Sequence, residues 1–181
     1  MYKRVIVFVI AGVLAGIVLI PVALITVPYV TVNFLLTISP NPPLPEYKYG
    51  EFPFRLEYEI DGKNIVVEDT VICKFDGIEY NGGQGKIRKW ESYLASTGEE
   101  SLLLWQIDET GKIYCFVGDA EYYMGDEKYP EKRPLAPRVY IVSSDFTYTD
   151  DNTLSQKRLL EKYNIEFIGW EFTDPITNTF K

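Results

Sequence analysis

Residues 54–68 read Phe-Arg-Leu-Glu-Tyr-Glu-Ile-Asp-Gly-Lys-Asn-Ile-Val-Val-Glu, and this stretch contains the clearest hairpin pattern of the chain. Before Asp61-Gly62, apolar residues alternate with charged ones, which is the pattern of a half-buried strand. The Asp-Gly pair favours a two-residue turn of type I′. Closing a hairpin there brings the apolar faces of its two strands together. The register that follows pairs Ile60 with Lys63, Tyr58 with Ile65, Leu56 with Val67, and Arg55 with Glu68.

A second hairpin is predicted further along the chain, with strands at 101–107 and 112–117. Glu109-Thr110-Gly111 would form its three-residue loop, with Gly at the left-handed position. In this register Trp105 faces Cys115 on the inward side. The remaining strand patterns lie at residues 71–75, 86–90, 138–143 and 165–172.

One helix is predicted in the C-terminal half. Thr153-Leu154-Ser155-Gln156 has the pattern of a capping box, and Asp150 and Asp151 would favour the positive end of the helix dipole. The helix should end near Tyr163, where Asn164 can adopt the left-handed conformation. Strand, helix and strand in this order could form a right-handed crossover, but one such unit does not make a doubly wound fold. We therefore predict an α+β domain, mainly antiparallel sheet with this one helix.

Residues 5–45 form a stretch of 41 residues without Asp, Glu, Lys or Arg, directly after Lys3 and Arg4. A secretory signal has an apolar core of only about 7–15 residues, whereas the apolar run here continues to Ile38. About 20 apolar helical residues cross a bilayer core. We therefore predict an uncleaved transmembrane helix over residues 5–27.

The apolar segment continues past this span, and its continuation has two interpretations. Pro28 disfavours helix at the residue before it, and residues 28–38 alternate like an extended segment, although a continuing helix is equally compatible. A re-entrant hairpin turning at Pro21 is an alternative, but two spans need about 40 residues. Gly12 and Gly16 form a small-xxx-small pair, so the segment could also pack into a membrane complex as a small subunit.

The flanking charges predict the orientation of the span. Lys3 and Arg4 place residues 1–4 in the cytoplasm by the positive-inside rule. Residues 39–45 contain four prolines and should form a short, stiff stalk. Residues 46–181 then form one extracytoplasmic domain of a size that suits a single core. The sequence thus predicts a single-pass protein of the cell membrane, in contact with the bilayer through residues 5–27.

The predicted outer domain is acidic. The chain has 26 acidic and 18 basic residues, a net charge of −8. Since Lys3 and Arg4 lie outside the domain, residues 46–181 hold 26 acidic against 16 basic residues, or −10. Nucleic acids and anionic lipid headgroups prefer basic surfaces, so neither is expected as a partner of the domain. A solubilising surface is the simpler explanation of the charge.

The chain contains no His, which removes Ser-His-Asp and Cys-His nucleophiles and His-ligated zinc. Two cysteines cannot form a thiolate zinc site alone, and no phosphate-binding glycine motif is present. We therefore expect no cofactor, no metal site and a binding domain rather than an enzyme. The alternative is an anchored hydrolase of envelope material that uses paired carboxylates or calcium, with Asp145, Asp150 and Asp151 as the calcium candidates.

Cys73 and Cys115 both fall on predicted inward faces of strands. Outside the membrane, one pair of cysteines is typical of a disulfide. Closing a loop of this size would stabilise the fold by about 4 kcal/mol. Two buried free thiols are the alternative.

Residues 118–126, Gly-Asp-Ala-Glu-Tyr-Tyr-Met-Gly-Asp, contain the candidate ligand-binding side chains. Aromatic faces beside carboxylates suit a protein, peptide or glycan ligand, because rings stack while acids bind amines or hydroxyls. A tyrosine-anchored turn that covers one end of the core is the simpler interpretation. The candidates are Asp119, Glu121, Tyr122, Tyr123 and Asp126.

Overall fold

A computed structural model describes the chain in two compact units. The first comprises Met1–Pro42 with Ile78–Ile87, and the second comprises Pro43–Gly77 with Arg88–Lys181. The residues described are 2, 17, 20–22, 24–34, 37–81, 85–109, 111–126, 137–142 and 153–181. The elements are β1 (Tyr49–Ile60), β2 (Lys63–Asn81), β3 (Gly85–Leu94), β4 (Leu102–Gln106), β5 (Lys112–Phe116), α2 (Ala120–Tyr123), β6 (Arg138–Val142), β7 (Thr153–Leu154), α3 (Gln156–Tyr163) and β8 (Ile165–Phe172).

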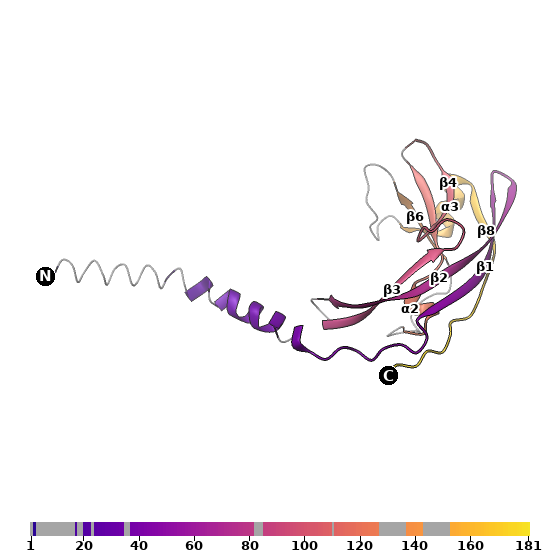
Figure 1. Cartoon of the computed structure of the whole chain (residues 1–181). Helices are drawn as coiled ribbons and strands as arrows, with labels where there is room; N and C mark the ends of the chain where they lie inside the picture. The colour runs from indigo at the N-terminus through magenta and orange to yellow at the C-terminus, as the bar shows by residue number, and fades with distance from the viewer. Residues whose placement is uncertain are drawn as a thin grey trace. The chain divides into compact units, whose positions relative to one another are not determined.

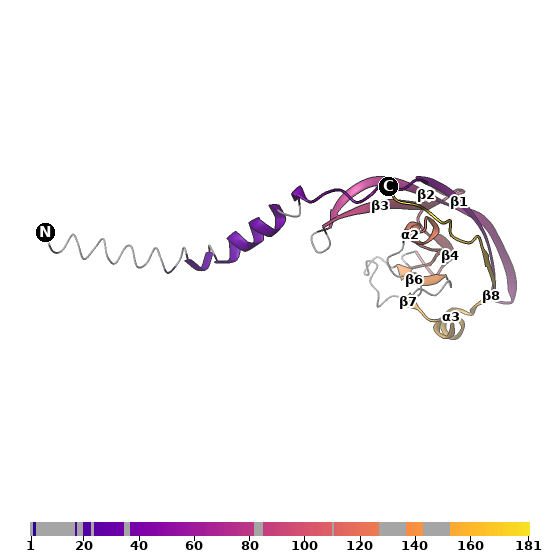
Figure 2. The ribbon, with the colours of Figure 1, turned by 90° about the horizontal axis from the view of Figure 1, so that it is seen from below.

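Two four-stranded sheets enclose the core of the second unit (Figure 1). Their strand orders are β3-β2-β1-β8 and β4-β5-β6-β7. Within the second unit, the first sheet curves over the second, as Figure 2 shows. β1 pairs antiparallel with β2 and β8, and β5 pairs antiparallel with β4 and β6. This confirms the prediction of a mainly antiparallel domain, in which the predicted helix, α3, is joined by the four-residue α2.

The first hairpin has the predicted turn and register. Asp61 and Gly62 have φ of 51° and 74°, as a type I′ turn requires. Leu56 pairs with Val67, and every other predicted pair is also formed. β2 does not end after Val67 but continues through the separately predicted strand 71–75, so the two form one strand. The inward residues of β1 are Phe52, Phe54, Leu56, Tyr58 and Ile60, each at most 4% exposed.

The predicted register of the second hairpin is wrong. The pairing shifts between Leu103 and Trp105, so Trp105 lies opposite Ile113 instead of Cys115. Leu104 is the residue that enters the core, with 5% exposed, while Leu103 and Trp105 are 45% and 41% exposed. Since side chains alternate along a strand, an irregularity of one residue moves the rest of the strand to the other face.

α3 has the predicted end but a different start. Ser155 is its N-cap and accepts a hydrogen bond from the backbone N–H of Arg158, while Thr153 lies in β7. Asn164 takes the left-handed C-cap conformation, as predicted. The right-handed crossover is not formed, because β8 pairs antiparallel with β1 in the first sheet whereas β6 lies in the second sheet.

The C-terminal tail pairs with the beginning of the second unit. Leu44 and Lys181 exchange backbone hydrogen bonds of 2.8 and 3.0 Å. The side-chain amide of Asn178 accepts from the backbone N–H of Tyr47 and donates to its carbonyl oxygen. Figure 1 shows the C-terminus beside this segment. The predicted stalk, residues 39–45, therefore ends in backbone that is already paired.

The described part of the apolar segment is helical. Residues 20–22, 24–34 and 37–38 are in helix, so the chain continues helically through Pro28 and does not become extended there. No helix among the described residues has the length and hydropathy needed to cross a membrane. Residues 5–16, 18–19 and 23 of the predicted span lie outside the described part.

Cys73 and Cys115 are both fully buried, on β2 and β5, and both are free thiols in the structure. Burial raises the pKa of Cys73 to about 12, and the charge of Glu121 adds to this shift. Burial alone raises the pKa of Cys115. Both thiols are therefore neutral at physiological pH and closed to solvent.

We predict that neither thiol reacts with N-ethylmaleimide in the folded chain at pH 7.5, because the reactive thiolate is both scarce and buried. Both should react in urea, as measured by intact mass. An added exposed thiol, Glu100→Cys, is the matched control and should react without urea. Reaction in urea only after a reductant would show that the pair is a disulfide instead.

Candidate functional site

The segment 118–126 forms a tight turn that two glycines make possible. Gly118 has φ of 132°, and a Cβ at this position would lie 2.8 Å from the ring of Tyr123. Gly125 has φ of 65°, and its Cβ would lie 2.4 Å from the carbonyl oxygen of Ile176. A side chain at either position would be strained by its backbone conformation and would collide with a neighbour.

Tyr123 belongs to the core. Its side chain is 2% exposed, its hydroxyl donates to the carbonyl oxygen of Val117 at 2.8 Å, and its ring stacks on Phe52 with centroids 4.7 Å apart. Burial raises its pKa. The ring of Tyr122 packs edge-on against the ring of Tyr123, with centroids 5.2 Å apart. Tyr123 therefore anchors the turn, and its ring is buried in the core instead of being exposed to a ligand.

Asp126 is held by a buried ion pair. Its carboxylate accepts hydrogen bonds from Trp90 Nε1 at 2.7 Å and from two nitrogens of Arg88 at 2.7 and 2.5 Å. The side chains of Arg88 and Asp126 are 20% and 8% exposed. Arg88 also donates to the carbonyl oxygen of Pro43 at 3.1 Å and lies over the ring of Phe180 at 4.2 Å. One guanidinium thus joins β3, the turn after α2, the end of the stalk and the C-terminal tail.

Asp119 lies nearer the surface, and the five candidates do not converge on one point. The side chain of Asp119 is 26% exposed and forms an ion pair of 3.5 Å with Arg138. Glu121 is close enough to Cys73 to influence its pKa. Tyr123 therefore belongs to the core, Asp126 to the pair with Arg88, and Asp119 to the pair with Arg138.

The calcium candidates cannot be placed. Asp145, Asp150 and Asp151 lie outside the described residues. In the part of the chain that the structure covers, no three His, Cys, Asp or Glu side chains are grouped so that they could hold a metal ion.

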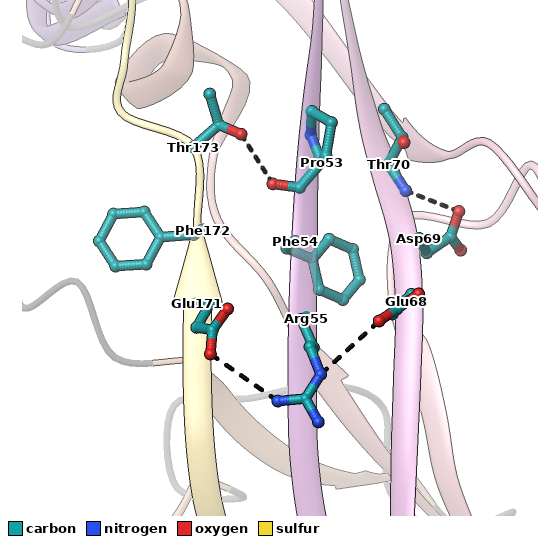
Figure 3. Close-up of a pocket in the computed structure, with 9 residues that line it drawn as sticks. All are labelled: Pro53, Phe54, Arg55, Glu68, Asp69, Thr70, Glu171, Phe172 and Thr173. Atoms are coloured by element: carbon teal, nitrogen blue, oxygen red, sulfur yellow. Dashed lines mark hydrogen bonds and ion pairs between the residues drawn. The ribbon is translucent and has the colours of Figure 1, made fainter.

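The first sheet carries a depression of about 590 Å³ that sequence reasoning did not identify (Figure 3). Figure 3 shows Arg55 of β1 between Glu171 of β8 and Glu68 of β2. The guanidinium nitrogens lie 3.7 Å from Glu171, 3.6 Å from Glu68 and 3.0 Å from Glu57. The depression is lined by Pro53, Phe54, Arg55, Glu68, Asp69, Thr70, Glu171, Phe172 and Thr173.

The charges around Arg55 leave an acidic, accessible surface. Three carboxylates surround one guanidinium, and the side chains of Glu68 and Glu171 are 75% and 76% exposed. A hydrogen bond from Asn64, followed by the charge of Arg55, lowers the pKa of Glu57. These groups can bind a cationic or hydroxyl-bearing ligand through charge-assisted hydrogen bonds. The Arg55–Glu68 pair follows from the first hairpin, but Glu171 joins it only because β8 pairs with β1.

Comparison with models of protein families, with curated proteins and with solved structures finds no match to this chain. What the protein does is therefore inferred from the arrangement of its own residues.

We predict that Asp126→Asn destabilises the fold by about 3–5 kcal/mol, because it leaves a largely buried guanidinium without its counter-charge. Urea unfolding of the full chain in mild detergent, followed by tryptophan fluorescence, measures the change.

Asp119→Asn is the matched control for this prediction. It removes the more exposed pair with Arg138 and should cost no more than about 1 kcal/mol. Equal effects of the two substitutions would contradict a special role of the Arg88–Asp126 pair.

Proposed function

We propose that this chain is a single-pass protein of the cell membrane that holds an acidic β domain outside the membrane, where the domain binds a partner rather than catalyses a reaction. The observation that carries the proposal is the exposure of the apolar helix. Such a surface in water would be unfavourable, whereas a helix that is apolar all round suits a lipid environment. Among the described residues 17–38, the large apolar side chains that are more than half exposed are Ile17, Ile20, Val22, Leu24, Ile25, Val27, Tyr29, Val30, Val32, Phe34 and Ile38.

The hydrogen bonds made by polar side chains in this helix also suit a lipid environment. The hydroxyls of Thr26, Thr31 and Thr37 each donate to the carbonyl oxygen four residues earlier, at 2.7–2.8 Å. The amide of Asn33 does the same at 2.8 Å. Inside a bilayer, polar groups must find partners within the protein because water is absent. These four side chains already have such partners on their own helix.

The binding role is supported by the depression around Arg55. Its outer carboxylates, on Glu68 and Glu171, are exposed and lie on two strands fixed by their pairing with β1. Carboxylates on paired strands stay at a fixed distance from each other. This favours a partner whose cationic or hydroxyl groups have the matching spacing. The partner that fits best is a protein, peptide or glycan that presents an ammonium or guanidinium group, or several hydroxyls, to this surface.

The orientation is tested with added thiols in intact cells. A membrane-impermeant maleimide should label Glu100→Cys from outside, and Tyr2→Cys only after permeabilisation, because residues 1–4 are expected in the cytoplasm. Wild-type chain is the control and should stay unlabelled, since its two thiols are buried. The reverse labelling pattern, or recovery of the chain in the soluble fraction, would refute the proposed topology.

The binding surface is tested by neutralising its exposed carboxylates. Glu68→Gln with Glu171→Gln should lower recovery of bound partners from detergent extract about tenfold, if each charged contact contributes about 0.7 kcal/mol. Glu99→Gln with Glu100→Gln removes the same charge from an exposed turn and should change nothing. Unchanged partners with the first pair would exclude this surface.

A further inference from the structure

We propose that the end of the β2–β3 hairpin, residues 78–81 and 85–87 of the described part, is a second contact of the chain with the membrane, at the level of the lipid headgroups. The inference rests on the anchor proposed above. It adds a surface that was not predicted from the sequence, where residues 86–90 were expected only to form a strand.

The hairpin end is tied to the outer end of the apolar segment by two hydrogen bonds. The hydroxyl of Tyr80 donates to Asn33 Oδ1 at 3.3 Å, and Lys86 Nζ donates to the carbonyl oxygen of Ser39 at 2.9 Å. Ser39 directly follows Ile38, where the apolar run stops. Ile78–Ile87 accordingly belongs to the same compact unit as Met1–Pro42, and not to the unit that contains the two-sheet core.

The side chains at these two positions are those that prefer a membrane–water interface. Tyr80 is 41% exposed, and a tyrosine places its ring among the upper acyl chains while its hydroxyl stays polar. Lys86 can lay its aliphatic stem along apolar surface and keep its ammonium group at the headgroups. Tyr29, 72% exposed on the helix, adds a second ring of the same kind to this unit.

Charge attraction does not supply this contact. The domain carries −10, and Glu79 beside Tyr80 is itself exposed. Partition of Tyr80 and of the Lys86 stem into the interface needs no anionic lipid. The contact is therefore expected on zwitterionic phosphatidylcholine, and it should change little between low and high salt, since screening acts on charge pairs.

Fluorescence quenching by lipid tests the proposal in the full chain, reconstituted in phosphatidylcholine vesicles that contain a doxyl-labelled lipid. A fluorophore is attached to single added thiols at three positions. Val27→Cys reports the anchor, Asn81→Cys reports the hairpin end, and Lys63→Cys reports the opposite end of β2. The label at position 81 should be quenched at least about twofold more than the label at 63, as expected for an interfacial site.

The outcomes separate the two proposals. Quenching at 27 without extra quenching at 81 overturns the second contact and leaves the anchor intact. No quenching at 27 overturns the anchor, and the second contact with it.

A variant series then tests the residues named. Tyr80→Ala with Lys86→Gln, made in the Asn81→Cys chain, should reduce quenching at 81 by about half or more, because both interfacial groups are lost. Tyr49→Ala is the matched control, since Tyr49 is 53% exposed but belongs to the second unit, and it should leave the quenching unchanged. Full quenching in the Tyr80–Lys86 variant would overturn the assignment to these side chains.

Discussion

The buried ion pair between Arg88 and Asp126 is the constraint on which the second unit depends. Taking two charges out of water costs several kcal/mol, and their attraction offsets this cost only when the geometry is good and the remaining donors are satisfied. Here Arg88 also reaches the Pro43 carbonyl oxygen and the Phe180 ring, and Asp126 also accepts from Trp90. The pair therefore fixes where four separate segments of the chain meet, which an apolar contact of the same size would not specify.

β1 connects this interior with the candidate binding surface. Its inward side chains fill the space between the sheets, and Tyr58 donates across that space to the carbonyl oxygen of Leu104 at 3.2 Å. Its outward side chains include Arg55, which β2 and β8 surround with Glu68 and Glu171. One central strand thus determines both the packing of the core and the spacing of the exposed carboxylates.

Features encoded within a few residues could be predicted from the sequence. Asp61-Gly62 determines its own turn, and the turn then determines the register of the strands beside it. Asn164 ends α3 for a similar local reason, because asparagine tolerates the left-handed conformation. The register at Trp105 could not be predicted, because an irregularity in a strand leaves no residue pattern as clear as a turn.

Features that join distant residues could not be predicted. Arg88 and Asp126 are 38 positions apart, and either residue alone resembles an ordinary surface charge. The acidic segment 118–126 was therefore a candidate for ligand binding. In the structure Tyr123 packs in the core and Asp126 forms the buried ion pair with Arg88. Glu171 meets Arg55 only through the pairing of β8 with β1, which no local pattern specifies.

The pairing of Leu44 with Lys181 has a mechanical consequence. Force carried along the backbone from the apolar segment enters the second unit at residues 43–47, and residues 44–47 are already hydrogen-bonded to residues 178–181. Residues 178–181 share this force with β1. The contact of Phe180 with Arg88 passes part of it to β3. Residues 178–181 thus hold the entry segment of the domain in place, and their removal by a protease would leave residues 44–47 without these hydrogen-bond partners.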